Sequence, residues 1–168
     1  MPRAQSTDMY HVFKFKVMET SSLRMIPVAG FTTVTVPEFS LENVEYKEGI
    51  WTYRRKYPGD VTVSDVTMTK GVVKQSSFMY DWVKATIDGK AYRIDFDIYQ
   101  FHRDDISGDE TYENVQASRI IHCFEVIPLR VKPGSDFDAM ASEVSLEEID
   151  VSIERFTIEY KVTNKRYA

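Results

Sequence analysis

The sequence predicts a mainly β protein, a barrel or sandwich of antiparallel strands with one short α-helix. Three observations favour this fold: apolar and polar residues alternate along most of the chain, only one segment has helical spacing, and the alternation slips by one residue in two places. The 168 residues, 43% of them hydrophobic and 13% aromatic, suffice for one core. We therefore expect residues 1–168 to form a single domain.

The first expected strand lies near the N-terminus, where apolar residues at 13, 15 and 17 alternate with Lys14 and Lys16. A second alternating pattern runs through residues 33–36 and stops at Pro37. Proline has no backbone N–H to donate, so Pro37 predicts a strand end, an edge or a bend before alternation resumes at Phe39.

One segment, about residues 77–87, predicts a helix. Its apolar positions follow the i, i+3, i+4, i+7 spacing of one helix face: Met79, Trp82, Val83 and Thr86. Ser76 or Ser77 is expected to accept hydrogen bonds from the first free amides, and Gly89 to adopt the left-handed conformation after the last turn. The alternative for Asp88-Gly89 is a two-residue hairpin turn.

The remaining strand patterns lie in the second half of the chain. In "YRIDFDIYQF", Ile94 and its apolar partners at 96 and 98 face away from a charged side, which predicts one dry and one acidic, wet sheet face. In the last pattern, apolar residues occupy odd positions from Ile149 to Ile153 and even positions from Phe156 onward. This slip near Glu154 predicts a β-bulge or a barrel corner, and a similar switch occurs between residues 63 and 66.

Composition limits the classes of function. The net charge is −5, and the basic cluster at 54–56 is only local, so we expect no general or sequence-specific nucleic-acid binding. No secretion signal or run of eighteen apolar residues is visible, so we expect a cytoplasmic protein without a membrane span. Cys123, in an apolar run, is expected to be a buried thiol.

Catalytic and metal-binding patterns are weak. His11, His102 and His122 are scattered, and "HRDDISGDETYE" lacks the order of a calcium loop, which favours a solvated hairpin loop. Asp95 and Asp97 are about 7 Å apart on a strand, with nothing apolar nearby to raise one pKa. We therefore expect no enzyme activity, no cofactor and no metal.

Several ordered pieces together resemble a known family. They are "VEYKEG", "YRRKYPG", "VTMTKG", "FMYDWV" and "IPLRVKPGSDFDAMASEVSLEEIDVSIERF". Their order and spacing are similar to those of the tail-tube proteins of contractile phage tails and of phage-derived contractile injection systems. The resemblance implies the tail-tube β-barrel or sandwich fold.

The resemblance also implies a function and partners. It implies a structural subunit of the inner tube, in which hexameric rings share one β-barrel and stack into a hollow conduit for DNA or protein cargo. Partners would be further copies or related tube subunits, the sheath, and baseplate or spike proteins, with assembly in the cytoplasm before incorporation into a tail or particle. The long segment "HRDDISGDETYENVQ" and the polar N-terminal arm "MPRAQSTDMY" keep a tube-initiator subunit open. A monomeric ligand-binding β-barrel is a further alternative.

A long loop at about residues 45–60 is the candidate ring–ring interface. It combines aromatic residues with charges: Tyr46, Glu48, Trp51, Tyr53, Arg54, Arg55, Lys56 and Tyr57. The alternative is a mobile solvent loop.

A candidate lumen wall lies on the strand near residue 95. If this strand joins the inner barrel, then Arg93, Asp95 and Asp97 face the channel, and their acidic excess would repel a polyanion. The alternative is that the strand lies on the outer sheet.

Overall fold

The computed structural model describes residues 10, 12, 14–20, 26–72, 74, 77–90, 93–102, 117–140 and 142–161. These residues form ten strands and one helix. In chain order the elements are β1 (Phe15–Glu19), β2 (Ile26–Ala29), β3 (Phe31–Val34), β4 (Phe39–Tyr46), β5 (Arg55–Val63), β6 (Val66–Gly71), α1 (Phe78–Ile87), β7 (Ile94–Gln100), β8 (Arg119–Lys132), β9 (Leu146–Ser152) and β10 (Arg155–Tyr160). His11, residue 13 and most of the expected loop after His102 lie outside the described residues.

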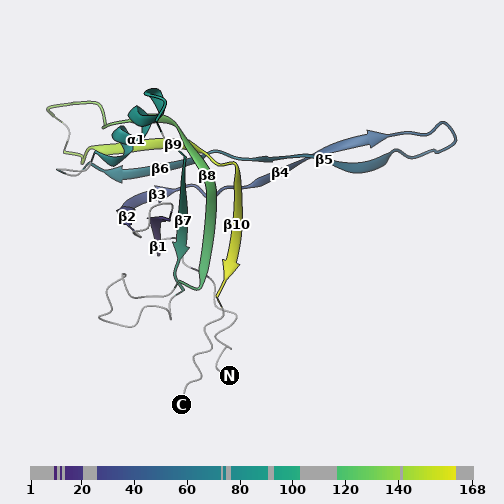
Figure 1. Ribbon diagram of the computed structural model, residues 1–168, viewed down its shortest axis with the longest axis horizontal. Helices are drawn as coiled ribbons and strands as arrows, with labels where there is room; N and C mark the ends of the chain where they lie inside the picture. The colour runs from purple at the N-terminus through teal and green to yellow at the C-terminus, as the bar shows by residue number, and fades with distance from the viewer. Residues whose placement is uncertain are drawn as a thin grey trace, which may run out of the picture.

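The long strand β8 joins two antiparallel sheets (Figure 1). Its first half pairs with β7 and β10 and belongs to the order β2-β1-β7-β8-β10, which we call the first sheet. Its second half pairs with β9 in the order β8-β9-β6-β3, the second sheet. This arrangement confirms the predicted mainly antiparallel β fold with a single helix.

Two irregularities turn the corner between these sheets. On β8, Glu125 adopts a positive φ of 55°, and its backbone N–H donates to Asp95 Oδ1 at 2.7 Å. On the neighbouring chain segment, the strand stops after Ser152 and resumes at Arg155. The predicted slip near Glu154 is therefore confirmed, and it serves to redirect the chain from β9 into β10.

The core lies between the sheets and α1. Apolar side chains of β1, β6, β7, β8 and β9 are buried together, and Met79 and Trp82 of the helix cover them. The free Cys123 is buried in this core, as predicted. Burial raises the pKa of its thiol to about 12.

The helix lies where its spacing predicted, and its end forms as expected. Gly89 has φ +69°, Gly89 N donates to Thr86 O, and Lys90 N donates to Ala85 O, which is the Schellman pattern. The expected N-terminal cap does not form at Ser77, and Ser76, the other candidate, lies outside the described residues. Ser77 makes no side-chain cap bond, because its hydroxyl donates to Asp81 Oδ2 at 2.6 Å.

Strands β4 and β5 form a long hairpin that projects from the body, which we call the arm (Figure 1). Among the described residues, these strands pair only with each other. Pro37 lies in the break between β3 and β4, as predicted. At the base of the arm, the Phe39 ring stacks on Phe156 of β10 with centroids 4.0 Å apart.

Candidate functional site: the arm and the polar sheet faces

The arm exposes nearly all of its side chains, including large apolar ones. Cross-strand partners share a face, and Leu41 opposes Val61 near the body while Val44 opposes Tyr57 farther out. Positions 41 and 44 point to opposite faces of one strand. The apolar surface therefore changes face along the arm, at a bulge that lies between these pairs.

Gly59 allows the strands to approach at this bulge. A Cβ there would lie 2.9 Å from Val44 Cγ2 and 3.1 Å from the carbonyl oxygen of Glu42. Only glycine avoids both contacts without displacing the opposite strand. The "YPG" at residues 57–59, within the range expected to be a loop, thus has a structural role in β5.

The structure gathers the eight predicted interface residues on the outer half of the arm. Within the range expected as a loop, it places the end of β4, a connection at 47–54 and the first half of β5. The candidates, in chain order, are Tyr46 at the end of β4, Glu48, Trp51, Tyr53 and Arg54 in the connection, and Arg55, Lys56 and Tyr57 in β5. Sequence reasoning missed Ile50, which is 98% exposed at the tip and stood out by no pattern.

Local contacts organise the tip of the arm. The Arg55 guanidinium lies over the Trp51 ring, 4.6 Å from its centroid, and Trp51 N donates to the Glu48 carbonyl at 3.1 Å. Glu45 pairs with Arg54 at 3.0 Å and reaches Lys56 at 4.0 Å. The tip therefore presents apolar rings and an excess of positive charge in a defined arrangement.

The three lumen candidates lie on one side of β7 but bind different partners. Arg93 Nη1 contacts Glu125 at 3.2 Å and Glu154 at 2.9 Å, both at the corner between the sheets. Asp95 accepts the bond from the amide of Glu125. These contacts give Arg93 and Asp95 a structural role at the bulge.

Asp97 contradicts the expectation of a wet face at its own position, because it is only 6% exposed. Its Oδ1 lies 2.8 Å from His122 Nδ1, and the Tyr99 hydroxyl donates to its Oδ2 at 3.4 Å. Burial raises the pKa of Asp97, although the bonds from His122 and Tyr99 act in the opposite direction. The carboxylate of Asp97 is therefore bound by side chains of the same sheet and is shielded from solvent.

His122 lies between two acids on neighbouring strands. Its Nε2 is 3.1 Å from Glu159 Oε2 of β10, and its Nδ1 faces Asp97 of β7. Burial lowers the pKa of His122, but the bonds to both carboxylates outweigh burial and raise the pKa above its usual value. The sequence showed only an isolated histidine, since its partners are 25 and 37 residues away.

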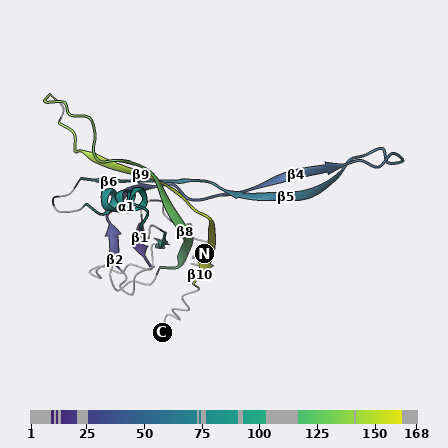
Figure 2. The same cartoon turned by 45° about the horizontal axis from the view of Figure 1, so that its top comes forward.

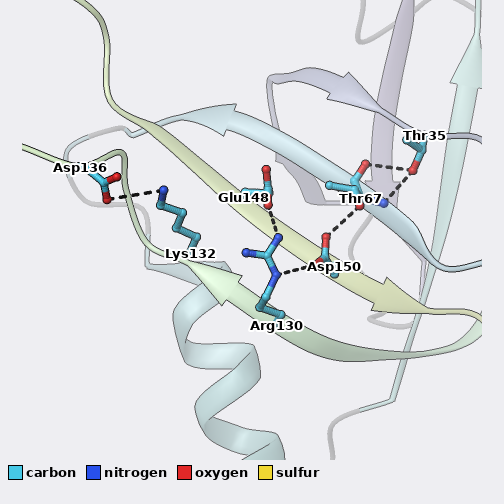
Figure 3. Close-up of polar contacts among 7 residues, drawn as sticks. All are labelled: Thr35, Thr67, Arg130, Lys132, Asp136, Glu148 and Asp150. Atoms are coloured by element: carbon cyan, nitrogen blue, oxygen red, sulfur yellow. Dashed lines mark hydrogen bonds and ion pairs between the residues drawn. The ribbon is translucent and has the colours of Figure 1, made fainter. Parts of the chain in front are cut away.

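A polar ladder crosses the outer face of the second sheet (Figure 3). Arg130 of β8 binds Glu148 and, at 2.6 Å, Asp150 of β9, and Asp150 accepts a bond from Thr67 of β6 at 2.8 Å. The bond from Arg130 is the main reason that the pKa of Asp150 lies below its usual value. The ladder joins three strands on the face opposite the core.

A charged pair is also buried on the core side of the second sheet. Lys70 Nζ lies 3.3 Å from Glu147 Oε2, between directly opposed residues of β6 and β9. Lys70 is 1% and Glu147 5% exposed. Nothing in the sequence pattern predicted this pair.

The first sheet has an open edge at β10, which pairs with β8 alone among the described strands. Ile158 and Tyr160 on this strand remain exposed. An uncovered edge with apolar side chains is suited to pairing with another strand.

The cavity that the described residues form beneath α1 leaves little space for a small ligand. The cavity between α1 and the sheets measures about 10 Å³, whereas ligand pockets measure about 300–1,000 Å³. In the part of the chain that is described, no three His, Cys, Asp or Glu residues are grouped to hold a metal ion. No helix in that part is long and apolar enough to cross a membrane.

Comparison with solved structures shows the same fold in contractile injection systems. A chain from the sheath-tube complex of the extracellular contractile injection system PVC, in its extended state, superposes with a TM-score of 0.75 at 20% identity, covering 95% of this chain and 99% of that one. A chain of the anti-feeding prophage tube-terminating cap gives 0.74 at 19%, covering 95% and 96%. A chain of the anti-feeding prophage baseplate gives 0.74 at 12%, covering 92% and 97%.

Sequence comparison identifies the family. No curated protein matches the chain significantly. Residues 11–157, however, match the family described as T4-like virus tail tube protein gp19, and this range covers most of the chain. The protein therefore belongs to the tail tube protein family.

Proposed function

We propose that this protein is a structural subunit of the inner tube of a contractile tail or injection system, in which six copies form a ring and rings stack into a hollow conduit for DNA or protein cargo. The role is architectural, without catalysis or a cofactor. Assembly takes place in the cytoplasm, and the finished tube belongs to the particle, within the sheath and on the baseplate.

The arm is the observation that carries this proposal. A two-stranded hairpin is marginally stable in water on its own, and this one exposes Ile50, Tyr53 and other large apolar side chains. Such a hairpin gains stability when a neighbouring subunit covers it. We assign the arm to contacts between rings, through the eight residues from Tyr46 to Tyr57 named above.

The open edge of β10 supports closure within a ring. Pairing with a neighbouring copy would cover this edge and continue the first sheet from subunit to subunit. If six copies each lend four strands, a spacing of about 4.8 Å and a tilt near 40° give a barrel roughly 40–50 Å across. A barrel of this width has room for a nucleic-acid duplex or a small folded protein.

We assign the polar face of the first sheet to the lumen. Arg93 and Asp95 lie on this face, and Asp97 lies on the same side of β7 but is covered by His122. This face and the adjoining corner carry charges of both signs: the carboxylates of Asp95, Glu125, Glu154 and Glu159 and the cations Lys14, Lys16, Arg93, Arg155 and Lys161. The carboxylates would weaken the adhesion of a polyanion during its passage.

A related role in the same tube is a second candidate, because the chain is about equally similar in fold to proteins of tube, cap and baseplate structures. In that role the protein would start or end a tube built from related subunits. Its rings would then stack only on those subunits.

Native mass spectrometry and negative-stain images test the proposal. We expect six-fold rings or stacked tubes, formed by the protein alone or after addition of baseplate partners. A strict monomer in the presence of its cognate baseplate would overturn it. Tubes formed by the protein alone indicate the main tube subunit, whereas rings seen only on the baseplate or the tube end indicate the related role.

A further inference from the structure

We propose that the connection between β8 and β9 receives the tip of the arm from a neighbouring copy of this chain. We call residues 133–145 the acidic segment. This inference rests on the proposed function and names the surface to which the arm binds.

Apart from residue 141, which lies outside the described residues, the acidic segment is held by hydrogen bonds at its base and is exposed farther out. Ser135 N donates to Ser145 Oγ at 3.1 Å, and Leu146 N donates to Ser135 Oγ at 3.0 Å, so the two ends are tied together. Between them, Met140 N donates to Asp138 Oδ1 at 2.9 Å, which shapes a turn. The three large apolar side chains of the segment are exposed: Phe137 fully, Met140 91% and Val144 73%.

The charges of the acidic segment and the arm tip are opposite. The segment carries Asp136, Asp138 and Glu143 and contains no Lys or Arg, although Lys132 of β8 lies 3.6 Å from Asp136 at its base (Figure 3). Residues 47–57 of the arm carry four basic side chains and one acidic side chain, Glu48. Each surface thus combines exposed apolar groups with an excess of one sign of charge. In a contact between them, the apolar groups would supply the buried area and the opposite charges would fix the relative position of the two surfaces.

The positions of the two surfaces require the contact to be between copies. The arm and the β8–β9 connection leave the body in opposite directions (Figure 2). The arm therefore points away from the acidic segment of its own chain. A contact between two different patches at opposite ends of a subunit is heterologous, and repeating it generates a ring or a stack.

Cysteine trapping tests the contact directly. Two variants, Tyr53→Cys on the arm and Met140→Cys on the acidic segment, are mixed, assembled and oxidised. We expect a disulfide between the two chains, at least tenfold more abundant than for the control mixture of Tyr53→Cys with Tyr80→Cys, whose second site lies on the exposed face of α1. Cys123 gives little background, because its thiol is buried and has a pKa of about 12. Equal trapping in both mixtures would overturn the proposal.

A charge exchange tests the energetics. Arg54→Glu with Lys56→Glu reverses the arm and leaves the Arg55–Trp51 stack in place, but it also removes the pairs with Glu45. Asp136→Lys with Glu143→Lys reverses the acidic segment and leaves Asp138 in place, but it also removes the pair of Asp136 with Lys132. We expect each double variant to lower the assembled fraction about tenfold at low salt. The chain that carries all four substitutions should return to within about twofold of the wild type, since reversed arms then meet reversed segments.

The outcomes separate this inference from the proposed function. If reversal of the arm disrupts assembly but reversal of the acidic segment does not, the arm binds elsewhere, and the tube proposal stands. If the wild type never assembles, even with baseplate partners, both are overturned. Circular dichroism of each variant verifies that the subunits are folded.

Discussion

The pair of Lys70 and Glu147 puts two opposite charges 3.3 Å apart on the core side of the second sheet. Glu147→Leu removes the carboxylate beside the buried ammonium group, and we expect it to lower the free energy of unfolding by about 1.5–3 kcal/mol. Adding Lys70→Met should recover part of this loss, because the charge that lost its neighbouring carboxylate is then absent as well. Urea unfolding of the wild type and the variants measures both values. A double variant no more stable than Glu147→Leu would contradict this reading.

The raised pKa of His122 predicts a pH dependence of stability. Since its pKa is higher in the folded protein than the ordinary value of 6.5, protonation stabilises the fold, fully so below pH 6.5. This contribution is lost as the pH rises through the folded-state pKa. The stability difference between the wild type and His122→Asn should therefore shrink from about pH 6 to pH 9. His102 is present in both proteins and serves as the internal control; a constant difference would show that His122 is not coupled to Asp97 and Glu159.

The sequence did not reveal the contacts of His122 and Lys70, because they depend on which strands are neighbours in the sheet. His122 meets Asp97 and Glu159 because β8 lies between β7 and β10, and the buried pair of Lys70 forms because β6 lies beside β9. Alternation identifies a strand and its faces but not its neighbours. Hence Asp97 was expected on a wet face, although a histidine from the next strand covers it.

At the scale of elements, Gly59 determines how closely the two strands of the arm approach each other. Gly59→Ala should push the strands apart at the bulge, because its Cβ would meet Val44 and the Glu42 carbonyl at 2.9 and 3.1 Å. We expect faster hydrogen exchange of the arm amides with little change in the melting temperature of the body, since the arm pairs only with itself among the described strands. Gly49→Ala is the matched control, because a Cβ there has no atom within 4 Å. Equal exchange in both variants would contradict this role for Gly59.

The sequence predicted best those elements whose signals are local. The helix and its end at Gly89 follow from side-chain spacing and one left-handed glycine, and the corner near Glu154 follows from a slip in alternation. The arm was harder to predict, because its apolar residues change face at the bulge and its outer half is rich in charges and turn formers. The eight interface candidates were nevertheless adjacent in sequence, and the hairpin keeps them together.

At the scale of the whole molecule, the exposed edge of β10 and the exposed arm are suited to different neighbours. The edge of β10 offers backbone groups to a strand beside it, whereas the arm extends away from both sheets (Figure 1). One subunit therefore has an edge that suits pairing with a strand of an adjacent subunit, and an arm long enough to contact a subunit that is farther away. A ring that stacks needs both kinds of contact, and a monomeric barrel needs neither.

Accessibility of the polar sheet face provides the test of the lumen assignment. Thr157 is a better labelling site than Asp95, because it is exposed beside His122 on the same face and does not hold the amide of Glu125. In assembled tubes, a small maleimide should label Thr157→Cys, and a maleimide on a polymer wider than the channel should label it at least tenfold more slowly than in free subunits. Tyr80→Cys on the exposed face of α1 is the control for access from outside the tube. If the polymer reagent labels Thr157→Cys equally fast in tubes and in free subunits, this face is on the outside, and its carboxylates do not line the conduit.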